Sequence, residues 1–536
     1  MLSVRAFAAI ALSLALSGVA ASTVAHAADQ PKYGGILRMY HRDSPANASI
    51  LEAATFSVNV PFMGVFNNLV IFDQHIAQNS LDTVRPELAE SWSWSGDHKK
   101  LTFKLRQGVK WHDGKPFTSA DVKCTFDLLT GKSQQKLRQN PRKTWYAQVA
   151  DVTTNGDFEV SFDLKRPQPS LLAMLASGYT PIYPCHVSPA EMRTHPIGTG
   201  PFKFVEFKAN ESIKLTKNPD YWKKGRPYLD GIEYTIIPNR STAILAFVAG
   251  KFDMTFPTHI TIPLLKDIKS QAPKAICDVE PTNVSTNIIV NSTSPPFNNI
   301  DIRRAMALAL DRNAFVKILF EGQADIGGTM LPPPQGLWGM PKDMLETIPG
   351  YGPDVNANRE EARKLMQKAG YGPDKHLAVK VSTRNLAEYR DPAVILIDQL
   401  KSIYIDGELD VVETANWFPK IARKDYMLGL NLTGNAIDDP DQSFYENYAC
   451  GSERNYTNYC NRDIEKLFDV QSQETDINKR KKLVWDIDKK LQEDVARPII
   501  FHARAGTCWQ PYVKGVTVMS NSSYNGFRYE DVWLDK

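Results

Sequence analysis

The sequence lacks the short motifs that mark common secreted enzymes. Neither Gly-x-Ser-x-Gly, the nucleophile turn of many hydrolases, nor His-Glu-x-x-His, the zinc motif of metalloproteases, occurs. No Cys-x-x-Cys pair points to redox or zinc chemistry. No partner stands at metal-ligand spacing from the single histidines His41, His186, His195, His259 and His502. We therefore expect no catalytic residue, metal site or cofactor. The rival class, a secreted hydrolase, would need a nucleophile with a positioned base.

The chain also has little excess charge. Its 536 residues carry a formal net charge of +3. The densest basic cluster, at 478–482, has a helical pattern with acidic residues on either side. A solvated helix face explains such a cluster better than a nucleic-acid patch does. We expect no nucleic-acid partner.

The strongly apolar run at the start of the chain is short. Arg5 precedes an apolar stretch at 7–19, and Ala25-His26-Ala27 fits an A-x-A cleavage site. Residues 1–27 are therefore predicted to be a secretory signal peptide, not a membrane anchor. Since no cysteine lies near the cleavage point, we expect an exported protein without a lipid anchor.

Cysteine is scarce, and six are spread along the chain. In an exported protein they can form disulfides, but spacing alone cannot choose among the pairings. Cys450 and Cys460 bracket a polar loop, "GSERNYTNY", and we expect a bond between them; two unrelated thiols are the alternative. Cys124 and Cys508 lie among apolar residues and can be plain buried thiols. The sequence leaves open the pairing of Cys124, Cys185, Cys277 and Cys508.

The first half of the chain after residue 27 is rich in strand patterns. Alternating apolar and polar residues predict half-buried strands at 101–111 and 158–164. From about residue 285 helices and strands alternate, which is typical of an α/β lobe. No fixed-period repeat or long linker occurs, and that favours lobes that share a sheet.

Helical spacing marks three helices in the second half. One runs from about residue 301 to Gly322. A second starts at Asn358, with Glu361 completing a capping box, and stops at Gly370. A third follows Asp476. Strands are expected between the helices, at 377–383 and 409–414.

A series of motifs extends over nearly all of the chain after residue 27. It begins with "RPELAESWSWSGDHKKLTFKLRQGVKWHDGKPFTSADV" at 85–122 and continues with "GTGPF", "KNPDYWKKGRPYLDGIEYTIIPN", "AGKFDM", "PPFNNIDIRRAMALALDRNAFV", "EEARKLMQKAGY", "NYCNRDIEKLFDVQSQETD" and "ARPIIFHAR". In this order the motifs resemble the extracytoplasmic solute-binding proteins of family 5. These serve the peptide, opine and nickel importers of the ABC type.

The resemblance implies an α/β fold with two lobes. It is the type II, cluster C fold of periplasmic binding proteins, with an extra subdomain in lobe I and a hinge between the lobes. Lobe I would comprise residues 28–62, 198–280 and 505–536, the extra subdomain residues 63–197, and lobe II residues 281–504. The change of pattern near residue 285 falls at the implied crossover.

The motif "GTGPF", at 198–202, is a glycine-rich turn that resembles a phosphate loop only superficially. A P-loop needs a lysine followed by serine or threonine at the start of a helix, whereas Pro201 and alternating phenylalanines lead into a strand. We interpret it as a corner where the chain returns to the sheet of lobe I, with glycine chosen for positive φ.

The resemblance also implies candidate ligand-binding residues. Arg384 lies just after a strand, where peptide-binding relatives place an arginine that can hold a ligand carboxylate; a surface arginine beside Glu388 is the alternative. Trp417 matches an aromatic residue near the cleft, although it can equally be a packing residue. Asn283 lies by the crossover and can reach the ligand.

The stretch "LNLTGNAIDDPDQSF", at 430–444, resembles the motif in which peptide-binding relatives place an aspartate that pairs with the ammonium group of the peptide. Here Asn435 follows Thr433 and Gly434, and the spacing to Pro440 is one residue longer. A neutral amide cannot offset a cationic amine. Asp438 can substitute if the extra residue turns it inward; a cap and turn cluster is the alternative. We expect Thr433, Gly434, Asn435 and Asp438 to belong to the ligand site.

The expected function is that of a periplasmic receptor for an ABC importer. Ligand would bind between the lobes, the lobes would close, and the protein, expected to be a monomer, would deliver the ligand to a membrane permease driven by a cytoplasmic ATPase. A short peptide or peptide-like compound is the expected ligand. The alternative is a non-peptide solute, such as an opine, a carboxylated or aromatic compound, a sugar derivative or a nickel chelate.

Overall fold

Three sheets of four or five strands organise the part of the chain described by the computed structural model, residues 30–53 and 55–536. The expected signal peptide, residues 1–27, lies outside the described residues. The first sheet has the strand order β1-β10-β9-β8, with β1 parallel to β10 and the other pairs antiparallel. Its strands and the nearby helices are β1 (Ile36–His41), β8 (Phe202–Lys208), β9 (Ser212–Lys217), β10 (Gly231–Ile236), α1 (Phe56–Phe62), η1 (Met63–Val65), α5 (Arg240–Val248) and α6 (Ile262–Gln271).

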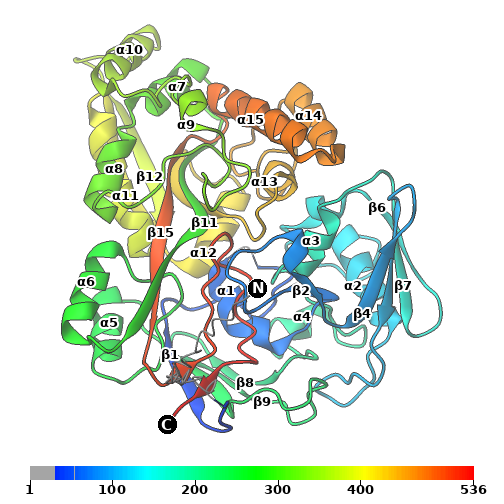
Figure 1. Cartoon of the computed structure of the whole chain (residues 1–536). Helices are drawn as coiled ribbons and strands as arrows, with labels where there is room; N and C mark the ends of the chain where they lie inside the picture. The colour runs from blue at the N-terminus through cyan, green and yellow to red at the C-terminus, as the bar shows by residue number, and fades with distance from the viewer. Residues whose placement is uncertain (1–29, 54) are drawn as a thin grey trace, which may run out of the picture. The chain divides into compact units, whose positions relative to one another are not determined.

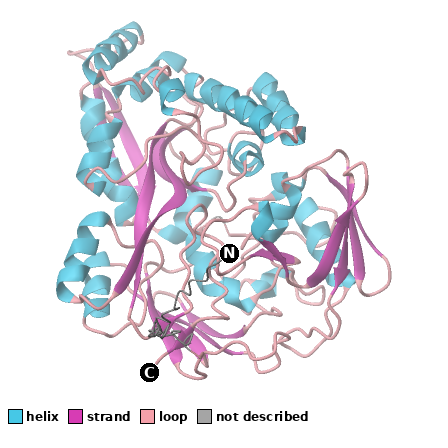
Figure 2. Ribbon diagram, in the orientation of Figure 1, coloured by secondary structure: helices cyan, strands magenta, loops and turns pink. Residues whose placement is uncertain are grey.

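The second sheet has the order β13-β12-β14-β11-β15. Strand β12 is parallel to β13 and β14, whereas β11 is antiparallel to β14 and β15. Figures 1 and 2 show helices α8 and α11 alongside this sheet. Its strands are β11 (Ile276–Val290), β12 (Leu377–Arg384), β13 (Ile405–Val412), β14 (Leu428–Gly434) and β15 (Ile499–Trp509). Its helices are α7 (Ile300–Ala309), α8 (Arg312–Phe320), α9 (Lys342–Leu345), α10 (Val355–Lys368), α11 (Ala387–Lys401), α12 (Thr414–Ala422), α13 (Pro440–Asn447), α14 (Arg462–Gln473) and α15 (Ile477–Glu493).

Strands β11 and β15 connect the two sheets (Figure 1). They pair along most of their length, and Met254 bridges Trp509 on β15 to Met39 on β1. The molecule is therefore two-lobed, with an α/β fold in each lobe and paired strands between them. The residues at the expected lobe boundaries, Pro281 and Arg504, pair with each other where β11 runs antiparallel to β15. The domain boundaries themselves stay predictions.

A separate antiparallel sheet, β4-β5-β7-β6, lies to one side (Figure 2). The strands predicted at 101–111 and 158–164 correspond to its central neighbours, β5 and β7. The elements of this region are β2 (Val70–Phe72), η2 (Leu81–Thr83), β3 (Val84–Pro86), β4 (Ala89–Trp94), β5 (Lys100–Leu105), α2 (Ser119–Thr130), η3 (Lys143–Tyr146), β6 (Val149–Thr154), β7 (Glu159–Leu164), α3 (Leu171–Ala176) and α4 (Pro189–Met192). At the C-terminus, β16 (Val513–Lys514) pairs with β17 (Trp533–Leu534).

Two of the three predicted helices differ in detail from the structure. The pattern from 301 to Gly322 forms two helices, α7 and α8, because Asp311 leaves the helix and its side chain caps α8 by accepting from Ala314 N at 2.9 Å. Helix α10 starts at Val355, before the predicted Asn358, because Asp354 is the N-cap. The third prediction is confirmed, since Asp476 caps α15.

The glycines of "GTGPF" are explained differently from the sequence interpretation. The turn does lead into β8, as predicted, but neither Gly198 nor Gly200 has a positive φ. They are needed because another segment of backbone lies against them. A Cβ on Gly198 would lie 1.9 Å from Val65 O, and one on Gly200 would lie 2.5 Å from Val65 C. Gly200 N also donates a hydrogen bond to Val65 O at 3.0 Å.

The substitution Gly198→Ala is expected to lower the free energy of unfolding by about 2 kcal/mol, because the new methyl group displaces the backbone at Val65. Urea denaturation measures this effect. Gly96→Ala is the matched control, since a Cβ there meets nothing within 4 Å. Equal stability of the two variants would mean that the turn tolerates the displacement.

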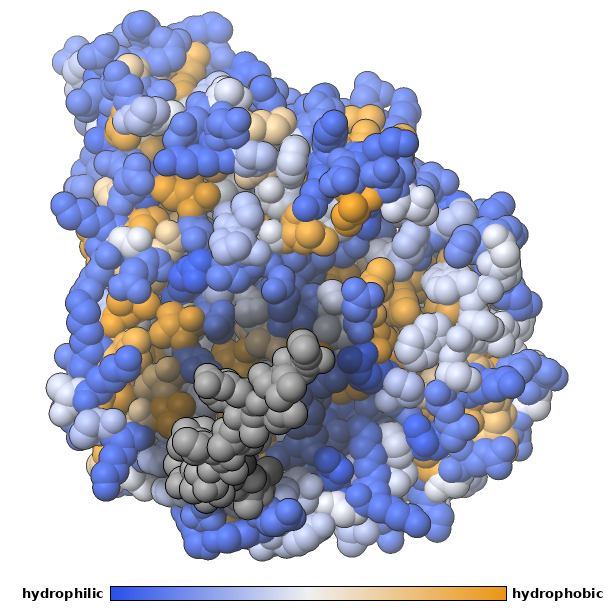
Figure 3. All heavy atoms as spheres, viewed as in Figure 1, coloured by the Kyte–Doolittle hydropathy of each residue, from blue (hydrophilic) through white to orange (hydrophobic). Residues whose placement is uncertain are grey.

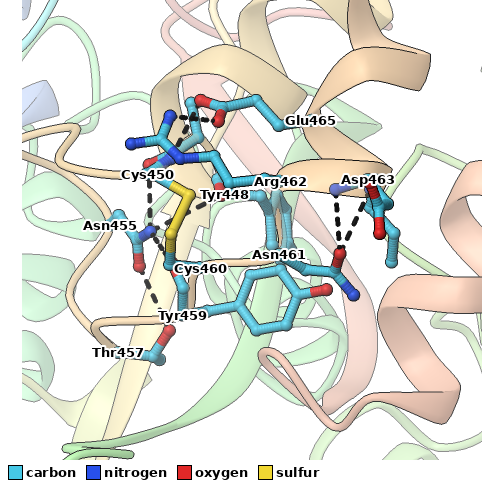
Figure 4. The surroundings of a disulfide bond; sticks show 12 residues. Tyr448, Cys450, Asn455, Thr457, Tyr459, Cys460, Asn461, Arg462, Asp463 and Glu465 are labelled. Carbon is cyan, nitrogen blue, oxygen red and sulfur yellow. Dashed lines mark hydrogen bonds and ion pairs between the residues drawn. A yellow bond between two sulfur atoms is a disulfide. The ribbon is translucent and has the colours of Figure 1, made fainter.

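All six cysteines are paired. The predicted bond between Cys450 and Cys460 is confirmed (Figure 4). The interpretation of Cys124 and Cys508 as plain buried thiols is wrong, since Cys124 bonds Cys185 and Cys508 bonds Cys277. These partners lie far apart in the sequence, so spacing carries no sign of them.

The Cys450–Cys460 disulfide closes a loop that is further fixed by hydrogen bonds (Figure 4). The side-chain amide of Asn455 donates to Ala449 O at 3.0 Å and to Tyr459 O at 2.6 Å. Cys450 N donates to Glu465 Oε1 on α14 at 3.2 Å. The loop is therefore held against lobe II, and the position of Arg454 within it is fixed.

Candidate functional site

A cavity of about 280 Å³ lies between the two lobes. Lobe I, lobe II, the connecting strands and the C-terminal segment all contribute side chains to its lining. Small-molecule sites occupy ~300–1,000 Å³, so this cavity is near the lower end of that range. Its size fits a small solute.

The lobe I wall carries cations and aromatic rings. Arg42 follows the end of β1, and its guanidinium lies 5.6 Å from the ring centroid of Phe56, the first residue of α1. Arg240 begins α5, which Asn239 caps by accepting from Thr242 N at 2.9 Å. His259 is buried, and its Nδ1 lies 3.0 Å from the hydroxyl of Tyr40.

The lobe II wall is partly apolar. Phe320 ends α8 and its ring lies 5.0 Å from that of Phe501 on β15, while Leu432 comes from β14. Arg454, from the disulfide-closed loop, also lines the cavity and pairs with the fully buried Glu446 of α13. The wall therefore combines an apolar surface with a fixed cation.

Arg384, the last residue of β12, lines the cavity but is held by a protein carboxylate. Its Nη2 donates to Asp43 of lobe I and, at 3.0 Å, to Ser57 Oγ. Its Nε donates to Thr414 Oγ1 at 2.9 Å. Burial raises the pKa of Asp43, but the Arg384 charge outweighs burial and holds that pKa well below its usual range. The pair joins the two lobes beside the cavity.

A second group of charges joins the lobes, and here lobe I supplies the cations and lobe II the carboxylate. Glu388, in the first turn of α11, lies 3.3 Å from Arg42 Nη1, 3.0 Å from Arg240 Nη2 and 3.5 Å from His259 Nε2. Burial raises the pKa of Glu388, but the charges of Arg240 and Arg42 lower that pKa by more than burial raises it. The pKa of Glu388 therefore lies well below its ordinary value. Burial lowers the pKa of His259 to about 3, so the imidazole is neutral beside these ions.

Of the residues expected from sequence to bind ligand, Arg384 and Gly434 line the cavity. At Gly434, a Cβ would lie 1.7 Å from the hydroxyl of Tyr524, so glycine makes room for that ring. Thr433 is buried beside the cavity; its Oγ1 accepts from Asn287 at 2.9 Å and from Arg497 at 3.1 Å. The ligand contact expected of Arg384 stays a prediction, since its guanidinium here binds Asp43.

The remaining expected residues lie outside the lining of this cavity. Asn435 N donates to Asn283 O at 2.9 Å, and Asn283, which has φ of 50°, donates its amide to Asn521 O at 2.8 Å. Asp438 accepts from Leu337 N at 2.9 Å. Trp417 is fully buried in a separate apolar cluster, and its indole donates to Asn431 at 3.2 Å. The extra residue before Pro440 does not direct Asp438 into the cavity, and Trp417 has the packing role given as its alternative.

Sequence reasoning missed most of the charged residues of the site, among them Arg42, Asp43, Arg240 and Glu388. Arg42 and Asp43 directly follow an apolar strand, and loops at strand ends are frequent locations of binding residues. The position of these two residues at a strand end could therefore have identified them as candidates from the sequence. Their pairing with Glu388 on α11 and Arg384 on β12 was not visible, because the partners are more than 300 residues apart.

The stability of the protein is expected to fall as pH drops from 6.5 to 5. Burial lowers the pKa of His41 to about 4 and that of His259 to about 3, so the unfolded chain binds more protons in this range. Stability is then present above about pH 6.5 and is lost toward the folded pKa values, by about 2 kcal/mol for each histidine at pH 5. Urea midpoints at pH 7, 6 and 5 measure it.

The matched variants for this prediction are His259→Gln and His195→Gln. The first removes a buried histidine and is expected to flatten the dependence on pH. The second replaces an exposed histidine and is expected to leave the slope unchanged. If stability depended on pH equally in both variants, groups other than His259 would be responsible for the acid sensitivity.

The face of the molecule in Figure 3 is mainly hydrophilic, with apolar residues in patches. No helix within residues 30–53 and 55–536 has the length and apolar character needed to cross a membrane.

The chain is similar to proteins of one family over most of its length. A family model for "Bacterial extracellular solute-binding proteins, family 5 Middle" matches residues 83–455. "Probable di/tripeptide-binding protein 5" of Pseudomonas aeruginosa (strain UCBPP-PA14) is 27% identical over 527 residues, covering 91% of this chain and 94% of that protein.

Solved structures share the fold. The ABC transporter-associated periplasmic binding protein DppA from Helicobacter pylori, in complex with peptide STSA, superposes with a TM-score of 0.81 at 22% identity, covering 94% of this chain and 99% of that one. The PBP AgaA from A.tumefacien R10, in complex with agropinic acid, gives a TM-score of 0.79 at 23% identity, covering 94% and 99%.

Proposed function

Because the chain belongs to the bacterial extracellular solute-binding proteins of family 5, we propose that it is the solute receptor of an ABC importer. It captures a small solute between its lobes and delivers it to a membrane permease whose cytoplasmic ATPase supplies the energy. Members of the family are binding proteins, and the receptor leaves its solute chemically unchanged.

The observation that carries this proposal is the cavity between the lobes. Both lobes line it, and ion pairs beside it, Asp43 with Arg384 and Glu388 with Arg42 and Arg240, run from one lobe to the other. A solute bound there contacts both lobes only when they are together, so binding shifts the population toward the closed form.

The ligand is proposed to be a short peptide or peptide-like compound. The size of the cavity and the peptide-binding relative support this choice. A non-peptide solute is the second candidate, favoured by the packing of Asn435 and Asp438 away from the cavity, where neither offers a carboxylate to a peptide ammonium group. Ligand roles for Asn283, Thr433 and Asn435 would be indirect, through the connecting strands.

The proposed setting is the periplasm, where the protein acts as a monomer after removal of residues 1–27 and without a lipid anchor. Disulfide pairing of all six cysteines supports an oxidising compartment.

A thermal-shift screen of the ligand-stripped protein tests the proposal. The screen contains dipeptides, tripeptides, opines, sugars, aromatic acids and nickel chelates, since a compound that binds only the folded state raises the Tm. We expect a shift with di- or tripeptides. A shift only with non-peptide compounds would select the second candidate, and no shift with any class would contradict the receptor function.

A further inference from the structure

We propose that Arg42 and Arg240 of lobe I together bind the carboxylate of the transported solute, and that Arg384 does not. This inference rests on the proposed function and identifies the chemistry of the ligand. The solute is a small monocarboxylic compound with an apolar body, and recognition needs no free amine.

The first argument is the distribution of charge around the cavity. Five arginines line it, and three of them have a protein carboxylate of their own: Arg384 with Asp43, Arg454 with Glu446 and Arg504 with Asp325. Arg42 and Arg240 instead share Glu388. His259 beside them is neutral, since burial lowers its pKa to about 3. One positive charge therefore lacks a buried, directly paired carboxylate at this end of the cavity.

Asp391 removes only part of this excess. It lies on α11 at the cavity, but it is exposed and is in none of the ion pairs formed within the described part of the chain. Burial raises the pKa of Asp391 and the nearby Arg240 charge lowers it, so this carboxylate offsets part of the Arg240 charge. Because Asp391 is exposed and forms no direct ion pair with Arg240, water screens that interaction.

The second argument is the hydrogen bonding of the two arginines. The Nε–H groups of Arg42 and Arg240 are buried, and neither has an acceptor among the described residues. Arg42 itself is 8% exposed. A buried donor without a partner is unfavourable, and a guanidinium presents donors in a fork that a carboxylate satisfies. A ligand carboxylate supplies both the missing charge and the missing acceptors.

The remaining lining residues of the cavity indicate the chemistry of the rest of the ligand. Phe320, Leu432 and Phe501 form an apolar surface in lobe II. Glu388 and Asp391 are the carboxylates in the lining, and Glu388 is already shared by two arginines. A ligand ammonium group therefore finds no dedicated buried partner, so blocking the amine has little effect on binding.

Isothermal titration with defined probes tests this inference. The probes are alanyl-leucine and alanyl-phenylalanine, their C-terminal amides and their N-acetyl derivatives. We expect the free acids and the N-acetyl acids to bind about equally, and the amides to bind about 10- to 100-fold more weakly, as expected when a hydrogen bond to a charged group is lost.

The variants Arg42→Gln and Arg240→Gln are expected to weaken binding of the acids about 10- to 100-fold and to remove the preference for acid over amide. Each variant leaves one arginine to neutralise Glu388. Arg42→Lys keeps the charge but loses the fork, and an intermediate preference is expected. The control is Arg106→Gln, whose side chain lies outside the cavity and stacks on Trp222. It is expected to keep the wild-type ratio.

Several results would overturn the inference. One is an unchanged acid preference in both Arg42→Gln and Arg240→Gln; another is a preference that only Arg384→Gln removes. Failure of all the probes would also overturn it. If the wider screen still found a ligand, the receptor function would stand without this carboxylate site, whereas failure of both would contradict the receptor function as well.

Discussion

Replacing Asp43 with asparagine is expected to open the ligand-free protein. Asp43 and Arg384 are both buried, and the substitution leaves the guanidinium without a counter-charge. Removing one partner of a buried ion pair costs about 3–5 kcal/mol. Because the two residues lie in different lobes, separating the lobes lets water reach Arg384 and relieves this cost. Small-angle X-ray scattering of the ligand-free variant should show a larger radius of gyration than the wild type.

Two further variants separate this effect from a general loss of stability. Asp43→Asn combined with Arg384→Gln removes both charges, and the double variant is expected to recover part of the closed population. Glu206→Gln breaks an exposed ion pair with Lys214, and no change is expected there. An Asp43→Asn protein with the scattering profile and unfolding midpoint of the wild type would show that this pair does not hold the lobes together.

The second large effect is expected from the disulfide between Cys277 and Cys508. It joins β11 to β15, and its cysteines are 231 residues apart in the sequence. Closing so long a loop restricts the unfolded chain strongly, and removal of the bond is expected to cost about 5 kcal/mol. The Cys277→Ser, Cys508→Ser double variant should therefore unfold at a markedly lower concentration of guanidinium chloride than the wild type.

The Cys450–Cys460 bond provides the comparison. Its cysteines are only 10 residues apart, and the same reasoning gives a cost of about 3 kcal/mol for the double serine variant. Equal losses in the two double variants would mean that loop length does not determine the stabilisation. The shorter loop carries Arg454, so its variant should also change ligand affinity, which the Cys277–Cys508 variant should not.

Local features of the fold could be predicted because they depend on nearby residues. Alternation at 101–105 and 158–164 indicated β5 and β7, and the aspartate before residue 477 indicated the start of α15. The errors arose where a tertiary contact decided the outcome. Nothing adjacent to Gly198 shows that Val65 lies against it, so positive φ was the available explanation for the glycine.

The candidate site was predicted less well for a related reason. Arg384 was predicted because the family resemblance implies an arginine just after this strand, and it does line the cavity. Its role depends on Asp43, which is 341 residues away in the sequence. For Trp417, residue type alone did not distinguish a position in the cleft from one in the core. In the structure its side chain is fully buried in an apolar cluster.

The order of the charges across the cleft has a further consequence. Arg42 and Asp43 are neighbours in the chain, and lobe II presents Glu388 to the first and Arg384 to the second. If the lobes met out of register, Arg42 would face Arg384 and Asp43 would face Glu388, and like charges in a dry cleft repel strongly. The two ion pairs therefore favour closure in the register seen in this structure. A solute large enough to keep the lobes apart would have to break both pairs, and the loss of these pairs would oppose its binding.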